Sequence, residues 1–188
     1  MNRLVAILIF ALFSSGCARY SMERQLEKVM GSEVRFTDRL ERISADSTEQ
    51  PAGPMKPIKL LQYSNSDECL PCAIAKLGDR LRFQGLLDED SDFELLVVHS
   101  YPAEQYAAER EKIMGIGEDW SVYFDPDYQF YDRNREILEH DYCHTLLLDR
   151  NNRVVMIGNP IASVTMWDLF KKIMENLQAH DGVYVPEK

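Results

Sequence analysis

The chain has 188 residues, 45% of them hydrophobic, with 21 lysines and arginines against 31 aspartates and glutamates. The length allows one domain with a substantial apolar core and an additional extension. Because phosphate binding requires clustered lysine and arginine, the formal net charge of −10 argues against a nucleic-acid partner.

The N-terminus has the pattern of an export signal. Arg3 precedes an unbroken apolar run, residues 4–13, which is too short to span a bilayer and is typical of a signal peptide. The small residues 14–16 then precede Cys17, as in bacterial lipoprotein signals. We therefore expect residues 1–16 to be removed and Cys17 to carry lipid, with a plain secretory signal as the alternative.

Either signal predicts an exported chain. The residues after the lipidation position, Ala18 and Arg19, are not acidic, which favours anchoring in the outer membrane facing the periplasm. Residues 17–55 are expected to form a tether and a small extension, with a short strand at 33–36 and a loop at 44–57. The main domain would then occupy residues 56–188.

The main domain alternates apolar strand patterns with helical patterns. Continuous apolar strands joined by helices indicate a parallel pair that is covered on both faces. The predicted order is a strand at 58–63, a helix at 70–83, a strand at 93–99, a helix from 102 to about 114, a strand at 122–124, short helix and loop at 127–143, a hairpin of strands at 145–148 and 153–157, and a helix at 163–178.

Two cysteines with C-x-x-C spacing lie where the first of these helices begins. Unpaired backbone N–H groups and the helix dipole stabilise a thiolate there, so Cys69 would attack and Cys72 would close a disulfide. Pro71 suits the first turn of a helix, where its missing N–H costs nothing. With Cys17 assigned to lipid, Cys143 is left as an odd thiol.

The order of strand, Cys69-Leu70-Pro71-Cys72 and helix resembles the active site of the thioredoxin superfamily. The later layout is similar to extracytoplasmic TlpA/ResA-type thiol–disulfide oxidoreductases, over about residues 56–178. The resemblance implies an α/β thioredoxin-like fold: βαβ, an inserted helix and strand, a β-hairpin and a C-terminal helix. It also implies an enzyme without a cofactor that exchanges disulfides with protein substrates and with a membrane or periplasmic redox partner.

In that superfamily a cis-proline precedes the threonine that opens the hairpin, and its loop lies against the cysteine pair. His144 holds this position before Thr145, so the resemblance places Cys143 and His144 near Cys69 and Cys72. His144 would assist proton movement, and Cys143 would be a bystander or a third exchange partner. Because a non-proline cis bond costs about 3 kcal/mol, we expect a trans bond before His144.

Three further residues bear on proton chemistry near this motif. Glu68 precedes the attacking cysteine, and its charge would oppose thiolate formation. Tyr63 stands where thioredoxins carry a buried carboxylate that moves protons. Glu94 on the adjacent strand is a candidate substitute, and its position in the pattern is equally consistent with facing solvent. His99 is expected only to end the second parallel strand.

Two other functions stay open. Cys69, Cys72, Cys143 and His144 form a Cys₃His set suited to zinc or copper(I). Thioredoxin-fold copper chaperones of the Sco type are similar in using two cysteines and a loop histidine, here His140 or His144, although their cysteines are spaced C-x-x-x-C. The third function is a thioredoxin-like binding module whose thiols do not turn over.

Overall fold

The computed structural model describes residues 22–43, 49–51, 55–65, 77–81, 85–88, 90–113 and 121–186. The expected signal peptide with Cys17, and the segment with Glu68, Cys69, Pro71 and Cys72, lie outside these residues. Among the described residues, no helix is long and apolar enough to cross a membrane.

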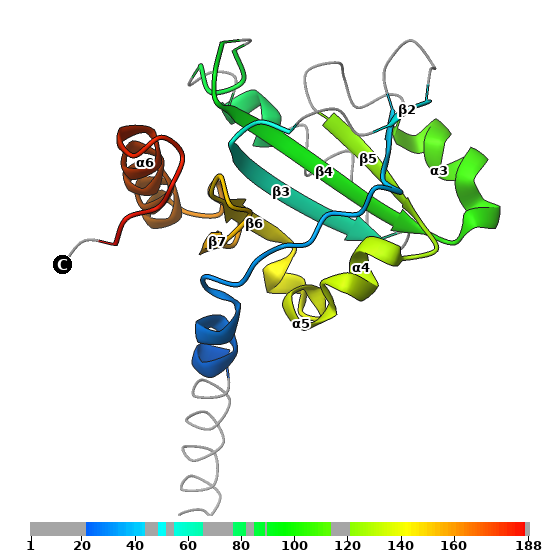
Figure 1. Ribbon diagram of the computed structural model, residues 1–188, viewed down its shortest axis with the longest axis horizontal. Coiled ribbons are helices and arrows are strands. Elements are labelled where there is room, and N and C mark those ends of the chain that lie inside the picture. The colour runs from blue at the N-terminus through cyan, green and yellow to red at the C-terminus, as the bar shows by residue number, and fades with distance from the viewer. Residues whose placement is uncertain are drawn as a thin grey trace, which may run out of the picture.

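The described residues form a seven-stranded sheet in the order β2-β1-β5-β4-β3-β6-β7 (Figure 1). The strands are β1 Glu41–Ile43, β2 Glu49–Pro51, β3 Ile58–Asn65, β4 Phe93–Tyr101, β5 Ser121–Pro126, β6 Thr145–Leu148 and β7 Val154–Ile157. The helices are η1 Ala103–Gln105, α3 Tyr106–Ile113, α4 Gln129–Arg133, α5 Arg135–Leu138, η2 Asp141–Cys143 and α6 Val164–Ala179, with helical residues also at 22–29 and 77–81.

The topology confirms the predicted thioredoxin-like fold. β3 and β4 are parallel neighbours, and β6 pairs antiparallel with β3 and then with β7 in a hairpin. β5 lies parallel to β4 on the other side, which makes it the inserted strand of the prediction. The hairpin turn also forms as predicted, because the Asp149 carboxylate accepts hydrogen bonds from the backbone N–H groups of Asn151 and Arg153.

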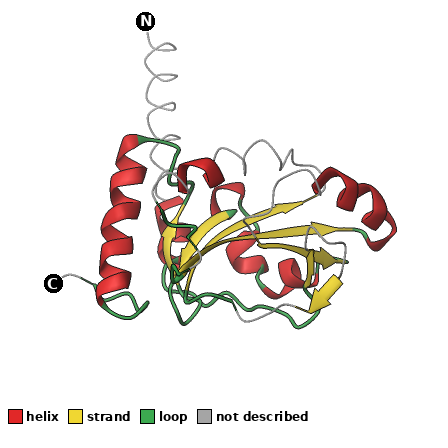
Figure 2. Cartoon of the chain, turned by 90° about the horizontal axis from the view of Figure 1, so that it is seen from above, coloured by secondary structure: helices red, strands yellow, loops and turns green. Residues whose placement is uncertain are grey.

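Both faces of the central strands are buried. On one, which we call the α6 face, Leu60, Leu95 and Leu147 pack with residues of α6 and with Leu77 and Leu81. On the other, the α4 face, Leu61, Leu96 and Leu146 pack with residues of α4, α5 and the N-terminal segment. Figure 2 shows the strands between these helical layers, with the long C-terminal helix at one end. The buried polar side chains of β3 and β4 therefore need a partner within the protein.

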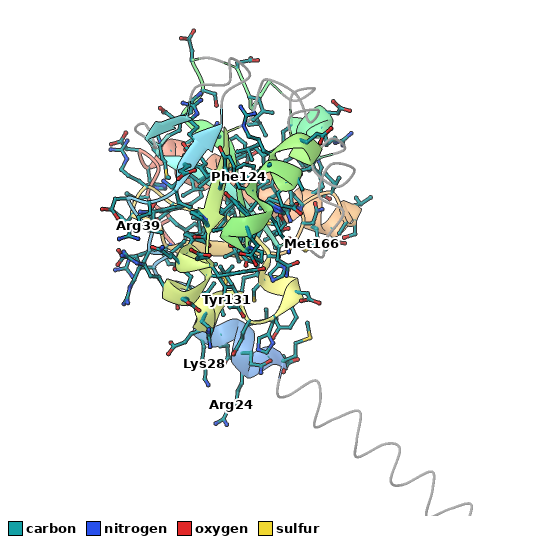
Figure 3. The ribbon with its side chains drawn as sticks, turned by 90° about the vertical axis from the view of Figure 1, so that its right-hand side faces the viewer. Arg24, Lys28, Arg39, Phe124, Tyr131 and Met166 are labelled. Atoms are coloured by element: carbon teal, nitrogen blue, oxygen red, sulfur yellow. The ribbon has the colours of Figure 1, made fainter. Side chains whose placement is uncertain are left out.

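The N-terminal segment packs on the α4 face and adds strands to the sheet. Val29, Val34 and Leu40 are buried there, whereas Arg24 and Lys28 point away from the body of the molecule (Figure 3). The predicted strand at 33–36 is wrong. That segment crosses the edge of β7 and makes only the isolated bridge between Glu33 and Arg153. The predicted loop at 44–57 contains β2, which forms because β1 pairs with β5 and offers it a free edge.

Asp125, the penultimate residue of β5, holds the start of α4 against the sheet. Its buried carboxylate accepts hydrogen bonds from Ser100 Oγ at 2.6 Å and from the backbone N–H of Phe130 at 2.8 Å. It thereby caps α4 from outside the helix, across Asp127 and Tyr128, which both have φ of 58° in the left-handed region. Burial raises the pKa of this carboxyl, against the effect of its hydrogen bonds.

Replacing Asp125 by alanine should lower the free energy of unfolding by about 3 kcal/mol, because the helix cap is lost and the Ser100 hydroxyl is left without its acceptor. Urea denaturation with an unchanged m-value measures this. The matched control, D132A on the exposed side of α4, removes only a surface pair with Arg135 and should cost less than about 1 kcal/mol.

The pH dependence provides a second check on Asp125. A raised folded-state pKa means that the fold binds the proton more tightly than the unfolded chain does, so this group's contribution to stability falls as pH rises through the folded pKa. D125A should remove that part of the pH dependence. Equal losses in D125A and D132A would contradict the assigned role.

Candidate functional site

The candidate site is the edge of the sheet where β3 and β4 end. Their last rows place Ser64 beside His99 and Asn65 beside Ser100. From Asn65 the chain continues to Cys69, four residues later, and Leu77, five residues after Cys72, packs on the α6 face. The described residues therefore define both ends of the cysteine-bearing segment. The cysteines, Glu68 and Pro71 lie outside the described residues, so their positions stay predictions.

A chain of three buried polar side chains lies on the α6 face of this edge. Ser64 Oγ is 2.7 Å from His99 Nδ1, and His99 Nε2 is 3.1 Å from Glu109 Oε2. The three residues are 0%, 2% and 3% exposed. They come from β3, β4 and α3, so the chain links the two central strands to the inserted helix.

These polar contacts contribute strongly to the docking of α3. The sequence of the helix, YAAEREKI, has no apolar stripe. Among its described side chains, the buried one is that of the charged Glu109. The ring of Tyr106 adds aromatic contacts, 6.0 Å from Tyr101 and 5.6 Å from Phe124. His99 was expected merely to end a strand, and Ser64 and Glu109 were not predicted as site residues. The available signal was the parallel register, which aligns two polar residues at the ends of two apolar strands.

His144 lies beside the end of β3, at the position that the resemblance assigned to it. Its carbonyl oxygen accepts a 2.7 Å hydrogen bond from the Tyr63 backbone N–H, and no cis peptide bond occurs among the described residues, which confirms the predicted trans bond before His144. Its ring Nε2–H donates to the Leu138 carbonyl at 3.1 Å and meets the Tyr63 ring edge to face, with centroids 5.0 Å apart. These contacts hold the loop after α5 against β3, and the catalytic role of His144 stays a prediction.

Thr145 lies on the α6 face of the same edge. Its hydroxyl donates a 2.8 Å hydrogen bond to Gln62 Oε1, and its carbonyl accepts one from the Gly158 backbone N–H at 2.7 Å. The residue thus joins β6 to β3 and to the end of β7. This position agrees with the predicted place of Thr145 at the opening of the hairpin.

Cys143 is fully buried in the apolar cluster of the α4 face. Burial, and to a smaller extent the Glu139 carboxylate, raises the pKa of this thiol to about 11. A thiol that resists ionisation is a poor nucleophile and a poor metal ligand. Its surroundings therefore favour the bystander role over that of an exchange partner.

Of the described half of the alternative metal set, Cys143 does not fit a metal well, because its raised pKa disfavours the thiolate that zinc or copper(I) requires. The bond from His144 Nε2–H to a backbone carbonyl is one that ligating histidines also make, so it decides nothing about a metal. Within the part of the chain that the structure describes, no three histidine, cysteine or acidic side chains are grouped to hold a metal ion.

Glu94 cannot replace the carboxylate that the family carries near its cysteines, because it lies at the wrong end of the sheet. It is paired in register with Lys59 near the start of β3, and its Oε1 accepts a 2.8 Å hydrogen bond from the Lys56 backbone N–H. At about 3.3 Å per residue, Ser64 is about 17 Å further along β3. The register of the parallel pair, which a single strand pattern does not reveal, decides this.

No family model and no curated protein matches the chain. Among solved structures, a thioredoxin-like protein from Porphyromonas gingivalis is similar with 14% identity, 77% of this chain and 92% of that chain covered, and a TM-score of 0.49. The exposed lipoprotein thioredoxin of Streptococcus pneumoniae is similar with 15% identity, coverage of 72% and 97%, and a TM-score of 0.48. A thioredoxin-like protein from Aeropyrum pernix follows with 16% identity, coverage of 86% and 98%, and a TM-score of 0.45. These similarities concern the fold alone.

The environment of Cys143 predicts low reactivity in the folded protein. Raising the thiol pKa from 9.0 to about 11 lowers the thiolate fraction about a hundredfold at pH 8, and burial blocks access further. Iodoacetamide labelling followed by peptide mass mapping should therefore modify Cys143 at least about a hundredfold more slowly in native than in urea-unfolded protein. Equal labelling rates in the two states would disprove the buried placement.

Proposed function

We propose that the chain is an extracytoplasmic thiol–disulfide oxidoreductase of the TlpA/ResA type, anchored to the membrane through lipid on Cys17. One observation carries the proposal: a C-x-x-C pair directly follows β3 of a thioredoxin-like sheet. Its substrates are disulfides or thiols of exported proteins, and a membrane or periplasmic redox protein restores the pair. The acidic chain remains without a nucleic-acid partner in this proposal.

Cys69 and Cys72 carry the reaction in two steps. The Cys69 thiolate attacks a substrate disulfide, forms a mixed disulfide and releases the first substrate thiolate. The Cys72 thiolate then attacks the Cys69 sulfur, closes the Cys69–Cys72 disulfide and releases the second substrate thiolate. The substrate gains two electrons and the pair loses two. With a substrate dithiol, the same steps run in reverse.

Replacing each of the two cysteines by serine should give a different defect in disulfide exchange. C69S should abolish disulfide exchange, whereas C72S should retain the attack and accumulate a mixed disulfide, because nothing resolves it. Titration in glutathione buffers, read by alkylation and intact mass, distinguishes these results. Turnover that persists in C69S, or a wild-type pair that never closes reversibly, would reject the oxidoreductase.

The same samples decide between the alternatives. Elemental analysis of the reduced protein that finds one stoichiometric zinc or copper, lost on replacing Cys143 or His144, would favour the metal-binding module. A wild-type disulfide that redox partners cannot reduce would indicate the non-catalytic binding module.

The anchor is tested separately from the reaction. After expression in a bacterial host, a C17S variant should lose the lipid mass and leave the membrane fraction, because the thioether to lipid cannot form. The disulfide exchange of the released chain should be unchanged. A variant that stays membrane-bound with an unchanged mass would show that Cys17 carries no lipid.

A further inference from the structure

A cavity of about 430 Å³ opens between the start of α6 and the helical residues 77–81. Its described lining residues are Arg80, Ile161, Ser163, Val164 and Trp167. Cavities that bind small molecules have volumes of about 300–1,000 Å³, and apolar and aromatic side chains with a few polar groups line them. The volume and the lining of this cavity fit that description.

Contacts outside the cavity hold its two sides in place. The helical turn that carries Arg80 packs on the α6 face through Leu77 and Leu81, which are both buried. On the other side, the Trp167 ring packs on Phe170 of the same face, with ring centroids 5.4 Å apart. The arrangement of the walls therefore does not depend on a ligand.

Arg80 stacks on the ring of Trp167. Its Cζ lies 4.8 Å from the ring centroid, so the guanidinium and the indole make a cation–π contact. A guanidinium also carries five N–H donors, and among the described residues no carboxylate pairs with that of Arg80. The stacking thus orients the cation and leaves donors for an acceptor that a ligand brings.

The apolar part of the lining is open to solvent. Val164 begins α6 with 79% of its surface exposed, and Ile161 and Trp167 are half-buried. A single exposed valine is ordinary on a protein surface. Here the valine adjoins an aromatic ring and a cation in a concave surface, so the apolar body of one ligand would remove all of this surface from water.

The lining is positively charged, although the whole chain has a formal net charge of −10. Arg80 is the charged residue among the described lining residues, and the first turn of α6 contains no acidic residue. Asp168, one turn further along, is paired with Lys171 at 2.9 Å. Since charges are screened beyond about 8 Å at physiological ionic strength, the local cation decides which ligand charge the cavity accepts.

We propose that this cavity binds a small apolar monocarboxylate, with the carboxylate on Arg80 and a ring or branched aliphatic body on the apolar lining. A carboxylate matches a guanidinium because it accepts two parallel N–H bonds. An inorganic anion would leave the apolar walls exposed, and a neutral apolar molecule would leave the guanidinium without a charged acceptor. The site uses none of the residues of the proposed cysteine chemistry, so its test is independent of that function.

The test uses 4-phenylbutyrate as the probe and the full chain with W120F, which leaves Trp167 as the remaining one of two tryptophans. The Trp167 fluorescence should change saturably, with a dissociation constant of about 1 mM. In the unsubstituted chain, the NMR signal of the Trp167 indole N–H should shift over the same concentration range. The uncharged 4-phenylbutyramide should bind about tenfold more weakly. Equal binding of the acid and the amide, or a response that never saturates, would overturn the proposal.

Two substitutions at exposed side chains separate the two parts of the site. R80Q should weaken the binding of 4-phenylbutyrate about tenfold and change that of 4-phenylbutyramide little, because only the acid loses a charged partner. V164A should weaken the binding of both compounds about fourfold, because each covers less apolar surface.

L169A is the matched control on the same helix. Leu169 is also an exposed apolar residue, at 44%, but it lies outside the described lining of this cavity. L169A should bind 4-phenylbutyrate as the wild type does. If L169A weakens binding as much as V164A, or if R80Q leaves binding unchanged, the compound binds elsewhere and the proposed site is wrong.

Discussion

The central constraint on this protein is that β3 and β4 are buried on both faces. Most side chains in the middle of these strands are buried, so the buried polar groups among them must find a partner inside the protein. Three of these polar side chains bond to a residue of another element: Gln62 to Thr145 of β6, Ser64 to His99 of β4, and Ser100 to Asp125 of β5. The polar contacts therefore specify how the surrounding elements dock.

The two ends of the parallel pair use this constraint differently. At the start of the strands, Lys59 donates to the carbonyl groups of Lys56 and Pro57, and burial lowers the pKa of its amine against the charges of Glu94 and Asp149. These hydrogen bonds go to backbone carbonyl groups directly before β3. At the other end the partners belong to β6, β5 and α3. The candidate site thus lies where polar bonds join separate elements rather than within one strand.

The fold was predictable because apolar runs and turn residues are local signals. The sequence Thr145–Leu148 defines β6 with its bounds, and the Asp149 turn follows from a side chain bonding to its own loop. The chain of Ser64, His99 and Glu109 was not predictable in this way, since Glu109 lies on a helix without an apolar stripe and its partner is ten residues away on a strand. The proposed role of Glu94 beside the cysteines was wrong for a related reason. Its pairing with Lys59, and not its neighbours in the sequence, places it at the other end of the sheet.

The two histidines at this edge illustrate how surroundings separate a structural from a chemical role. His144 donates to a backbone carbonyl and packs edge to face against the Tyr63 ring, two contacts that hold its loop against β3. His99 lies between a hydroxyl, which can deliver a proton, and a carboxylate, which stabilises the proton once it is bound. A positional match to a family motif singles out His144, but the free energy of protonation is shaped by the neighbouring groups. The contacts of His99 with Ser64 of β3 and Glu109 of α3 show that a histidine with no place in the motif can join three elements at this edge of the sheet.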